Sequence, residues 1–267
     1  MKIVSHNING LKVYMASDRC RILNEGSEVY CFQEVKCSDN SGILGALGQD
    51  ILNSYDVYSS INTFKKGYSG VTTLVRRDIP VLSFEIPVPC VSGLSGYAEG
   101  RIVCIEFEDF YLINLYNINS GGEIKTKDRP LFEAYLIDYI KNKCGNKSFI
   151  ISGDLNVCST LYDYWGDYER SMDLCPGLMK FEVDLFQNLV KELDLVDSFR
   201  YFHTIDRKYS WYGASKRKGT REPWETGHGW RLDYFLVSSG LVNRLVDSDI
   251  LELYQHHDHS PIILELT

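Results

Sequence analysis

The sequence contains no hydrophobic run long enough to cross a membrane. Its first residues, Met1-Lys2-Ile3-Val4, do not have the character of a signal peptide. No proline- or glycine-rich linker and no low-complexity stretch divides the chain. We therefore expect a monomer that folds as one domain, residues 1–267, inside the cell: in the nucleus of a eukaryote or the cytoplasm of a prokaryote.

Closely spaced cysteine pairs are also absent. The eight cysteines are scattered without a Cys-x-x-Cys motif, and several fall inside apolar runs. We interpret them as reduced core residues of an intracellular protein and not as zinc ligands. They occupy positions 20, 31, 37, 90, 104, 144, 158 and 175.

Basic residues are fewer than acidic ones, 28 against 36, which leaves a net charge of −8. This balance argues mildly against nucleic acid as a partner, because such binding depends on neutralising phosphate charge. The basic residues are clustered, however, and aromatics such as Tyr68, Trp211 and Trp230 lie among them. One such run alone is typical of a solvated loop, but together with the aromatics the runs favour a groove for nucleic acid. The runs are Lys65-Lys66, Arg207-Lys208 and Lys216-Arg217-Lys218 with Arg221.

Short apolar strands and amphipathic helices follow one another along the chain. Strands that come in two groups, with helices between them, fit two packed sheets covered by helices. We predict strands near residues 2–6, 28–33, 70–76, 102–107, 110–116, 148–153, 232–238 and 261–266. We predict helices near 17–25, 42–53, 127–143 and 180–194, the last with an apolar stripe of Phe181, Leu185, Leu189 and Leu193.

Polar side chains follow several of these strands at the point where each ends. Ligand sites in layered α/β proteins gather on the loops that leave strand ends. Each segment alone has an ordinary explanation, such as an Asx turn after the first strand or a salt bridge between Glu34 and Lys36 after the second. Their combination predicts a site built from Asn7 and Asn9, Glu34, Tyr116 and Asn119, Asp154 and Asn156, and Asp233 with Asp258 and His259.

Four acids in this set, Glu34, Asp154, Asp233 and Asp258, would repel one another if they converged without a divalent cation among them. Oxygen ligation favours Mg²⁺, with Mn²⁺ as a possible substitute, over Zn²⁺. Asp233 also suits a second role, since a buried acid can orient a histidine such as His259.

Several sequence strings together resemble a known family. They are SHNINGL (5–11), QEVK (33–36), KGYSGV (66–71), EGRI (99–102), GDLN (153–156), GWRLDYF (229–235) and DHSP (258–261). In their order and content the chain resembles the exonuclease III type of apurinic/apyrimidinic (AP) endonuclease, within the endonuclease/exonuclease/phosphatase superfamily. The resemblance runs from residue 2 to residue 266. Phosphoinositide phosphatases, sphingomyelinases and deadenylases of that superfamily share the Asn, Glu, Gly-Asp-x-Asn and Asp-His elements, but not GYSGV together with WRLDY.

The resemblance implies a fold and an activity. The fold is an α+β (α/β) four-layered αββα sandwich, in which two packed mixed β-sheets are flanked by helices and the active site lies at one end of the sheets. The activity is Mg²⁺-dependent hydrolysis of the DNA phosphodiester 5′ to an abasic site in base-excision repair, with 3′-phosphodiesterase or 3′→5′ exonuclease side activity. The partner is double-stranded DNA with abasic sites.

Catalytic roles are implied in the same way. Asp154, held by Asn156, acts as general base or positions the nucleophile. His259, oriented by Asp233, contacts a phosphate oxygen, and a nearby anion should raise the pKa of this histidine. The other implied phosphate contacts are Tyr116 and Asn119.

Three further sets of residues are implied by the resemblance. The cation ligands are Glu34, Asn7, Asn9, Asp154, Asn156, Asp258 and His259. The pocket for the baseless sugar consists of Trp211, Trp230 and Leu232, an apolar site that excludes a normal nucleotide sterically. The DNA contacts are Lys66, Tyr68, Arg101, Lys216, Arg217 and Lys218.

The chain departs from the family pattern at several places. His6 stands where the family usually has Trp, His257 where it has Ser, and Asn117-Ile118 where it has an apolar residue and Pro. The segments 158–180 and 212–229 are also unusual, the first acidic and the second long, and we expect both to face DNA. The acids of the first segment include Asp163, Asp167, Glu169 and Asp173.

Two alternatives remain open at this level. A phosphoesterase acting on inositol phosphates, lipid or RNA would use the same metal site, although Trp211, Trp230 and the basic loops argue against it. A catalytically inactive nucleic-acid-binding relative would lack part of the catalytic set. That set is present: Glu34, Asp154, Asn156, Asp233 and His259.

Overall fold

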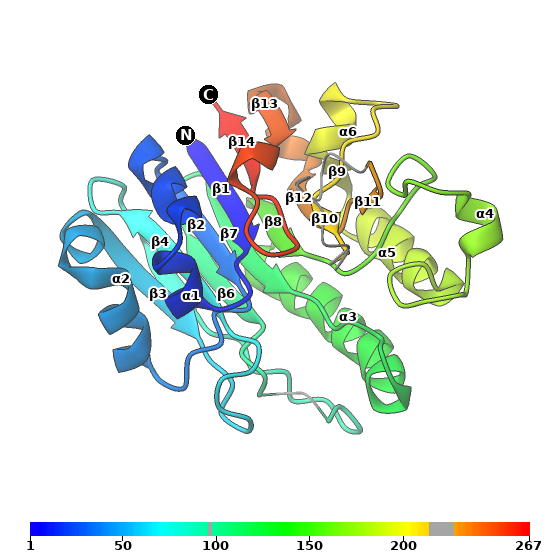
Figure 1. Ribbon diagram of the computed structural model, residues 1–267, viewed down its shortest axis with the longest axis horizontal. Helices are drawn as coiled ribbons and strands as arrows, with labels where there is room; N and C mark the ends of the chain where they lie inside the picture. Colours follow the sequence, from blue (N-terminus) through cyan, green and yellow to red (C-terminus); the bar gives the residue numbers. More distant parts are fainter. Residues whose placement is uncertain (96–97, 214–226) are drawn as a thin grey trace.

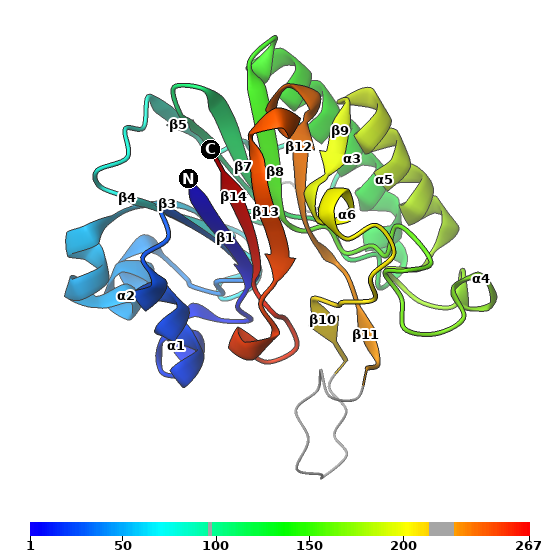
Figure 2. The same ribbon diagram turned by 90° about the horizontal axis from the view of Figure 1, so that it is seen from above.

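The computed structural model of the protein describes residues 1–95, 98–213 and 227–267. Two six-stranded β-sheets pack against each other in the middle of the molecule, and helices cover the outer face of each sheet (Figure 1 and Figure 2). The predicted four-layered αββα sandwich of the α+β class is therefore confirmed.

The first sheet contains strands from both ends of the chain. Its strands are β1 (Lys2–Asn7), β2 (Val29–Gln33), β3 (Tyr55–Ser60), β4 (Val71–Arg76), β13 (Leu245–Ile250) and β14 (Ile262–Leu266). They lie in the order β13-β14-β1-β2-β4-β3. β1 is parallel to β2 and antiparallel to β14, so the two termini lie close together (Figure 1).

The second sheet is built mainly from the middle of the chain. Its strands are β5 (Ser83–Glu85), β6 (Ile102–Glu106), β7 (Phe110–Tyr116), β8 (Ser148–Asp154), β9 (Leu195–Asp197) and β12 (Asp233–Ser238). They lie in the order β5-β6-β7-β8-β12-β9, with β7 and β8 parallel and the other neighbours antiparallel. Both sheets are thus mixed, as predicted.

Two pairs of helices form the outer layers. Helices α1 (Leu11–Met15) and α2 (Asn40–Ser54) share an apolar cluster with the first sheet. Helices α3 (Glu123–Cys144) and α5 (Lys180–Glu192) share another with the second sheet. The shorter elements are η1 (Asp18–Glu25), α4 (Tyr168–Ser171), α6 (Ser198–Phe202), β10 (Trp211–Tyr212), β11 (Gly229–Trp230), η3 (Ser239–Arg244) and η4 (Glu252–Tyr254).

The core between the sheets is apolar except at one end, where polar side chains of the two sheets are hydrogen-bonded to each other. Gln33 donates from Nε2 to Ser5 Oγ (3.0 Å) and to Asn114 Oδ1 (2.8 Å), so one amide joins the two sheets inside the protein. Such a buried amide is tolerated because its N–H groups are paired. The surrounding apolar residues include Ile3, Val29, Leu112, Ile150 and Phe235.

All eight predicted strands are present, and the missed ones are instructive. In the two six-stranded sheets β3, β5, β9 and β13 were not predicted, and these four form the edges; the short β10–β11 pair was not predicted either. An edge strand keeps exposed or half-buried residues, as in β13 and β5, and so lacks the continuous apolar run of an interior strand.

The predicted helices are found with two differences. The segment near 17–25 is a 3₁₀ helix. In α5 the predicted stripe is only partly right, because Phe181 and Leu185 are half-buried while Val183 and Phe186 pack into the core. Glu182 is buried on the same helix, where it accepts hydrogen bonds from the Gly177 and Met179 N–H groups.

Cysteines in the strands behave as core residues, with Cys31 and Cys104 buried in β2 and β6. All eight cysteines are free. In the part of the chain that the structure describes, none of the helices combines the length and apolar character needed to cross a bilayer.

Candidate active site

The polar strand ends meet at one end of the two sheets. The register places Asp154 opposite Asp233 in the antiparallel β8–β12 pair and beside Tyr116 in the parallel β7–β8 pair. Glu34 is the first residue after β2. His259 arrives from the turn before β14 and bonds to Asp233. Residues far apart in the sequence are therefore brought together because their strands end at the same level.

Asn7 links the two sheets at this point. Its Nδ2 donates to Glu34 Oε1 (2.9 Å) and to Asp154 Oδ2 (2.9 Å). Tyr116 donates its hydroxyl to the same Glu34 oxygen (3.0 Å). The backbone N–H of Asn156 donates to Asp154 Oδ1 (2.9 Å). The predicted support of Asp154 by Asn156 is present, but it comes from the main chain and not from the side chain.

Asn119 extends this network. It donates from Nδ2 to Asn156 Oδ1 (3.1 Å), and Asn156 donates from Nδ2 to the Asn117 carbonyl (3.0 Å). The unusual Asn117-Ile118 pair therefore still leads the chain to a position where Asn119 contacts the Asp154 loop. One hydrogen-bonded series runs through Asn119, Asn156, Asp154, Asn7, Glu34 and Tyr116.

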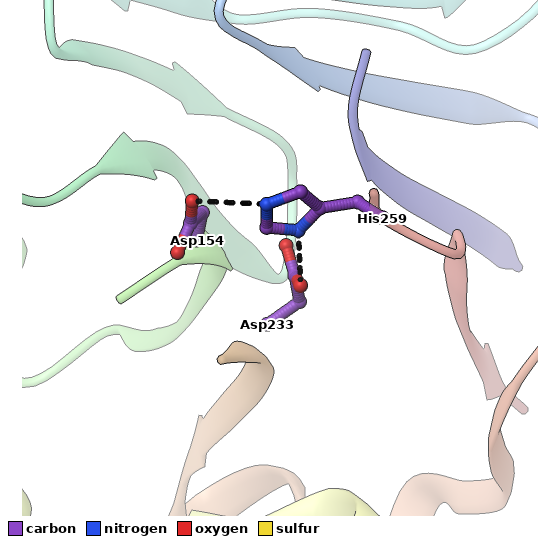
Figure 3. A group of neighbouring side chains, drawn as sticks. All are labelled: Asp154, Asp233 and His259. Atoms are coloured by element: carbon purple, nitrogen blue, oxygen red, sulfur yellow. Dashed lines mark hydrogen bonds and ion pairs between the residues drawn. The ribbon is translucent and has the colours of Figure 1, made fainter. Parts of the chain in front are cut away.

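His259 lies between two buried carboxylates (Figure 3). Its Nδ1 is 2.8 Å from Asp233 Oδ2, and its Nε2 is 3.9 Å from Asp154 Oδ2. The predicted orientation of His259 by Asp233 is confirmed. Because Nδ1 must donate to the carboxylate, Nε2 is the ring nitrogen that faces the centre of the site.

The electrostatics of the three groups are linked. Burial alone would lower the pKa of His259, but the charge of Asp233, its hydrogen bond and the charge of Asp154 raise it above its usual range, as predicted. Burial and then the charge of Asp233 raise the pKa of Asp154, and the opposing effects of His259 and Asn7 do not cancel this rise. The site thus holds a carboxylate that accepts a proton readily beside an imidazolium that retains one.

Glu34 contacts Asn7 in the site and also forms the salt bridge with Lys36 that is the ordinary explanation for an acid at this position. Lys36 Nζ lies 2.7 Å from Glu34 Oε2 and also donates to Asn9 Oδ1. Burial would raise the pKa of Glu34, but the hydrogen bonds from Asn7 and Lys36 outweigh it and hold this pKa below its usual range. Glu34 is therefore an anion at neutral pH.

The residues present suit a hard divalent cation. Among the described residues, Asp154, Asp233 and His259 offer ligand atoms that all lie within 4.8 Å of one another. Asp233 Oδ1 is buried and has no hydrogen-bond partner in the described chain, so it retains a free acceptor position. Carboxylate oxygens of this kind are preferred by Mg²⁺ and Mn²⁺.

Other predicted ligands make different contacts in this arrangement. Asn7 turns Nδ2, not Oδ1, toward the carboxylates, so it would bind a cation only with its amide reversed. The Asn9 oxygen accepts from Lys36. Asp258 Oδ2 accepts from Trp211 Nε1 (3.1 Å).

The three residues predicted for the sugar pocket meet in one apolar cluster. Trp211 and Trp230 face each other across the β10–β11 pair, with ring centroids 5.4 Å apart. Leu232 is buried beneath them. Tyr164 adds an aromatic edge against Trp230 at 5.2 Å, a contact that the sequence did not reveal. The indole bond to Asp258 ties this cluster to the catalytic turn.

The predicted DNA contacts have mixed positions. Lys66 is exposed, and Tyr68 accepts a hydrogen bond from Lys125 at its hydroxyl (2.5 Å). Arg101 requires a correction, because it is only 4 % exposed and donates to Glu99 and to the Tyr116 carbonyl. It supports a strand end of the site and does not offer its charge to DNA. Three predicted contacts, Lys216, Arg217 and Lys218, lie outside the described residues.

Arg129, which was not predicted as a residue of the site, is completely buried in α3. Its guanidinium donates to the carbonyls of Leu155 (2.9 Å) and Asn156 (2.9 Å) and to Glu133 (2.8 Å). It thereby fixes the loop that carries Asp154. The only sequence signal was an Arg-x-x-x-Glu spacing, which is common on exposed helices.

Left-handed backbone is concentrated at the site. Five of the eight non-glycine residues with positive φ among the described residues belong to its loops. Such conformations cost free energy and persist where the surrounding structure imposes them, often at functional sites. The five are Asn9 (φ 47°), Glu34 (53°), Lys36 (51°), Asn156 (52°) and His257 (55°).

Comparison with known proteins agrees with this geometry. A family model described as Endonuclease/Exonuclease/phosphatase family matches residues 4–253. The chain belongs to this family. It is an exonuclease III-type member, since an exodeoxyribonuclease of Bacillus subtilis is 31% identical over 99% of this chain and 98% of its own length.

Other relatives of the family cover 99% or more of the chain. The DNA repair nuclease APEX1 of Danio rerio is 29% identical over 100% of this chain and 82% of its own length. The solved AP endonuclease of Leishmania major superposes with a TM-score of 0.81 and 25% identity, over 99% of this chain and 87% of that one. These similarities support a hydrolytic DNA-repair nuclease of the endonuclease/exonuclease/phosphatase family.

Proposed function

We propose that this protein is a Mg²⁺-dependent AP endonuclease, which hydrolyses the DNA phosphodiester 5′ to an abasic site and leaves a 3′-hydroxyl. The observation that carries the proposal is the buried group of Asp154, Asp233 and His259, joined through Asn7 to Glu34. The same site acts on 3′-terminal groups as a 3′-phosphodiesterase or 3′→5′ exonuclease. The substrate is double-stranded DNA.

The chain's own residues account for activation of the water and for stabilisation of the phosphate, and the departing 3′ oxygen takes its proton from solvent. Asp154, whose pKa is raised, takes a proton from the attacking water. His259, held as imidazolium by Asp233, donates from Nε2 to a non-bridging phosphate oxygen. Burial and then the charge of Glu34 raise the pKa of Tyr116, which therefore stays a neutral donor.

A divalent cation would be held by Glu34 and Asp154, with Asp233 within reach. When bound it would supply charge neutralisation at the phosphate and at the departing oxygen. Mg²⁺ is the natural occupant of carboxylate-rich sites, and Mn²⁺ would substitute.

Recognition of the lesion rests on the apolar cluster. Trp211, Trp230 and Leu232 offer a surface that a sugar without its base can enter, whereas a complete nucleotide brings more volume and unpaired polar atoms. Trp211 is bonded to Asp258, next to His259, so sugar and phosphate would be bound side by side.

The test uses a duplex oligonucleotide with one tetrahydrofuran abasic analogue. Wild type with Mg²⁺ should cleave it 5′ to the analogue, while Asp154→Asn and EDTA-treated wild type should not. An intact duplex after incubation with folded, Mg²⁺-loaded wild type would refute the assignment. Inositol phosphates and RNA would then be assayed with the same protein.

A further inference from the structure

His6 lies on β1 directly before Asn7 and is completely buried. Because side chains alternate along a strand, the two residues point to opposite faces of the first sheet. Asn7 points between the sheets to Asp154, whereas His6 packs on the side of α1, with its ring 5.4 Å from that of Tyr14. The end of β1 therefore places one polar side chain between the two sheets and the next one against the helical layer.

The side chain of His6 contacts the main chain of His259. His6 Nε2 lies 3.2 Å from the His259 carbonyl oxygen. A carbonyl only accepts, so Nε2 must carry the proton and donate it, which leaves Nδ1 unprotonated. Nδ1 has no hydrogen-bond partner in the described chain. Burial, chiefly, lowers the pKa of His6 to about 3, so the ring is neutral at physiological pH.

The turn that carries His259 is held tightly. The N–H of His256 donates to the His259 carbonyl (2.8 Å), and the N–H of His259 donates to the His256 carbonyl (3.2 Å). Between them His257 adopts a positive φ of 55°. The His259 carbonyl thus receives two donors, one from its own turn and one from β1.

His259 is consequently held from both sheets. Asp233 on β12 of the second sheet binds its ring at Nδ1, and His6 on β1 of the first sheet binds its carbonyl. Two anchors on either side of the Cα atom fix both the position of the backbone and the direction of the ring. Without the His6 bond, the His259 carbonyl would keep only the His256 N–H of its own turn as a donor, and no side chain of β1 would hold it.

We propose that His6 is a positioning residue of the active site, which sets the place of His259 through a hydrogen bond to its main chain. The proposal rests on the proposed function, since its consequence is measured on phosphodiester hydrolysis. It also accounts for the use of a polar ring at a completely buried strand position, where an apolar side chain would satisfy packing alone.

The test compares substitutions that keep or remove the donor. His6→Gln retains an N–H group at the approximate position of Nε2, His6→Asn is too short to reach, and His6→Phe keeps a ring without a donor. We expect His6→Phe and His6→Asn to lower kcat about tenfold, since small misplacements of catalytic groups cost up to about 100-fold, with KM nearly unchanged. His6→Gln should recover most of the loss.

His203 supplies the matched control. Its Nε2 lies 3.1 Å from the Ser248 carbonyl, so it makes the same type of bond away from the site. His203→Phe should change thermal stability but leave kcat as in wild type. Equal losses in the Gln and Phe variants of His6, or an effect on KM alone, would show that the donor does not position His259.

A second readout is independent of activity. The proton between His259 Nδ1 and Asp233 Oδ2 should give a downfield ¹H NMR signal, which should shift or broaden in His6→Asn and return in His6→Gln. If wild type fails to cleave abasic DNA, the proposed function is refuted, but this signal still reports whether His6 positions His259. An unchanged signal in the Asn variant overturns the proposal.

Discussion

Asp154 and Asp163 are both almost completely shielded from solvent, yet their surroundings are opposite. Asp163 Oδ1 accepts from Arg231 Nε (2.6 Å) and Arg200 Nε (3.2 Å), and its Oδ2 accepts from the Thr160 N–H (3.0 Å). Asp154 instead faces a second carboxylate and receives only an asparagine amide and one backbone N–H.

Their proton affinities differ accordingly. Burial would raise both pKa values. The charges of Arg231 and Arg200 outweigh burial at Asp163 and lower its pKa to about 2, whereas the charge of Asp233 adds to burial at Asp154 and raises its pKa. A buried acid that is hydrogen-bonded to guanidinium groups holds the fold together. Among the described residues, Asp154 has only the His259 ring nitrogen 3.9 Å away as a cationic neighbour and is therefore available for a proton or a divalent cation.

Asp163 lies where the sequence did not lead us to expect it. The segment 158–180 was expected to present its acids, including Asp163, toward DNA. The structure buries Asp163, and its pairing with Arg231 fixes the strand that carries Trp230. The Arg231 N–H also donates to the Asp163 carbonyl (2.8 Å). This acid therefore supports the aromatic cluster instead of repelling phosphate.

The largest expected effect is on catalysis through Asp154. Asp154→Asn should reduce single-turnover cleavage of abasic duplex about 10²- to 10⁴-fold, the usual contribution of a positioned general base. Its thermal midpoint should stay equal or rise, because the substitution removes a charge that faces Asp233. A large loss of stability would contradict the view that this acid is uncompensated.

At Asp163 we expect a loss of stability and not a direct loss of catalysis. Asp163→Asn leaves the buried guanidinium of Arg231 with an incomplete partner and should lower the free energy of unfolding by about 3–5 kcal/mol. Urea denaturation of the variant and of wild type, both without metal, measures this difference. If the variant is as stable as wild type, the ion pairs of Asp163 do not hold the fold.

A divalent cation should stabilise the folded protein by binding at Asp154 and not at Asp163. Binding to the native state at 100 times Kd adds about 2.7 kcal/mol. For a chain of this size that raises Tm by about 5–10 °C. Differential scanning fluorimetry with and without Mg²⁺ should give this rise in wild type and Asp163→Asn. Asp154→Asn should lose most of it, and an undiminished rise there would place the cation elsewhere.

The smallest effect is on pH dependence in metal-free protein. The lowered pKa of Asp163 contributes stability that is present above pH 3.8 and is lost as the pH falls toward 2, roughly 2 kcal/mol in all. Asp154, with a raised pKa, has the opposite sign: its stability contribution declines as the pH rises above 3.8, because its ionised form is disfavoured.

Denaturation curves between pH 2 and 8 separate the two aspartates. Asp163→Asn should lose less stability than wild type as the pH falls toward 2. Asp154→Asn should lose less stability than wild type as the pH rises above 4. Parallel curves for wild type and both variants would mean that neither acid has a shifted pKa in the folded protein.

Local patterns were sufficient for much of the fold. The interior strands were predictable because a strand covered on both faces must be apolar over its whole length, as in β7, where all seven residues are buried. The edge strands, exemplified by β13, were not, because exposure allows polar residues and removes the pattern. Asp154, the last residue of β8, and Glu34, the first after β2, were detectable since acids at the ends of such strands have no packing role.

The sequence by itself determined the family, the layered α+β fold and the set of polar residues that end the strands, because these depend on short-range patterns and fixed motifs. Only the tertiary structure decided which acids are paired with a cationic side chain. Arg101 and Asp163 resemble surface charges in the sequence, and both are buried and paired. The contact of His6 with the His259 carbonyl spans almost the entire chain. Burial and long-range pairing set proton affinity, and neither is encoded in neighbouring residues.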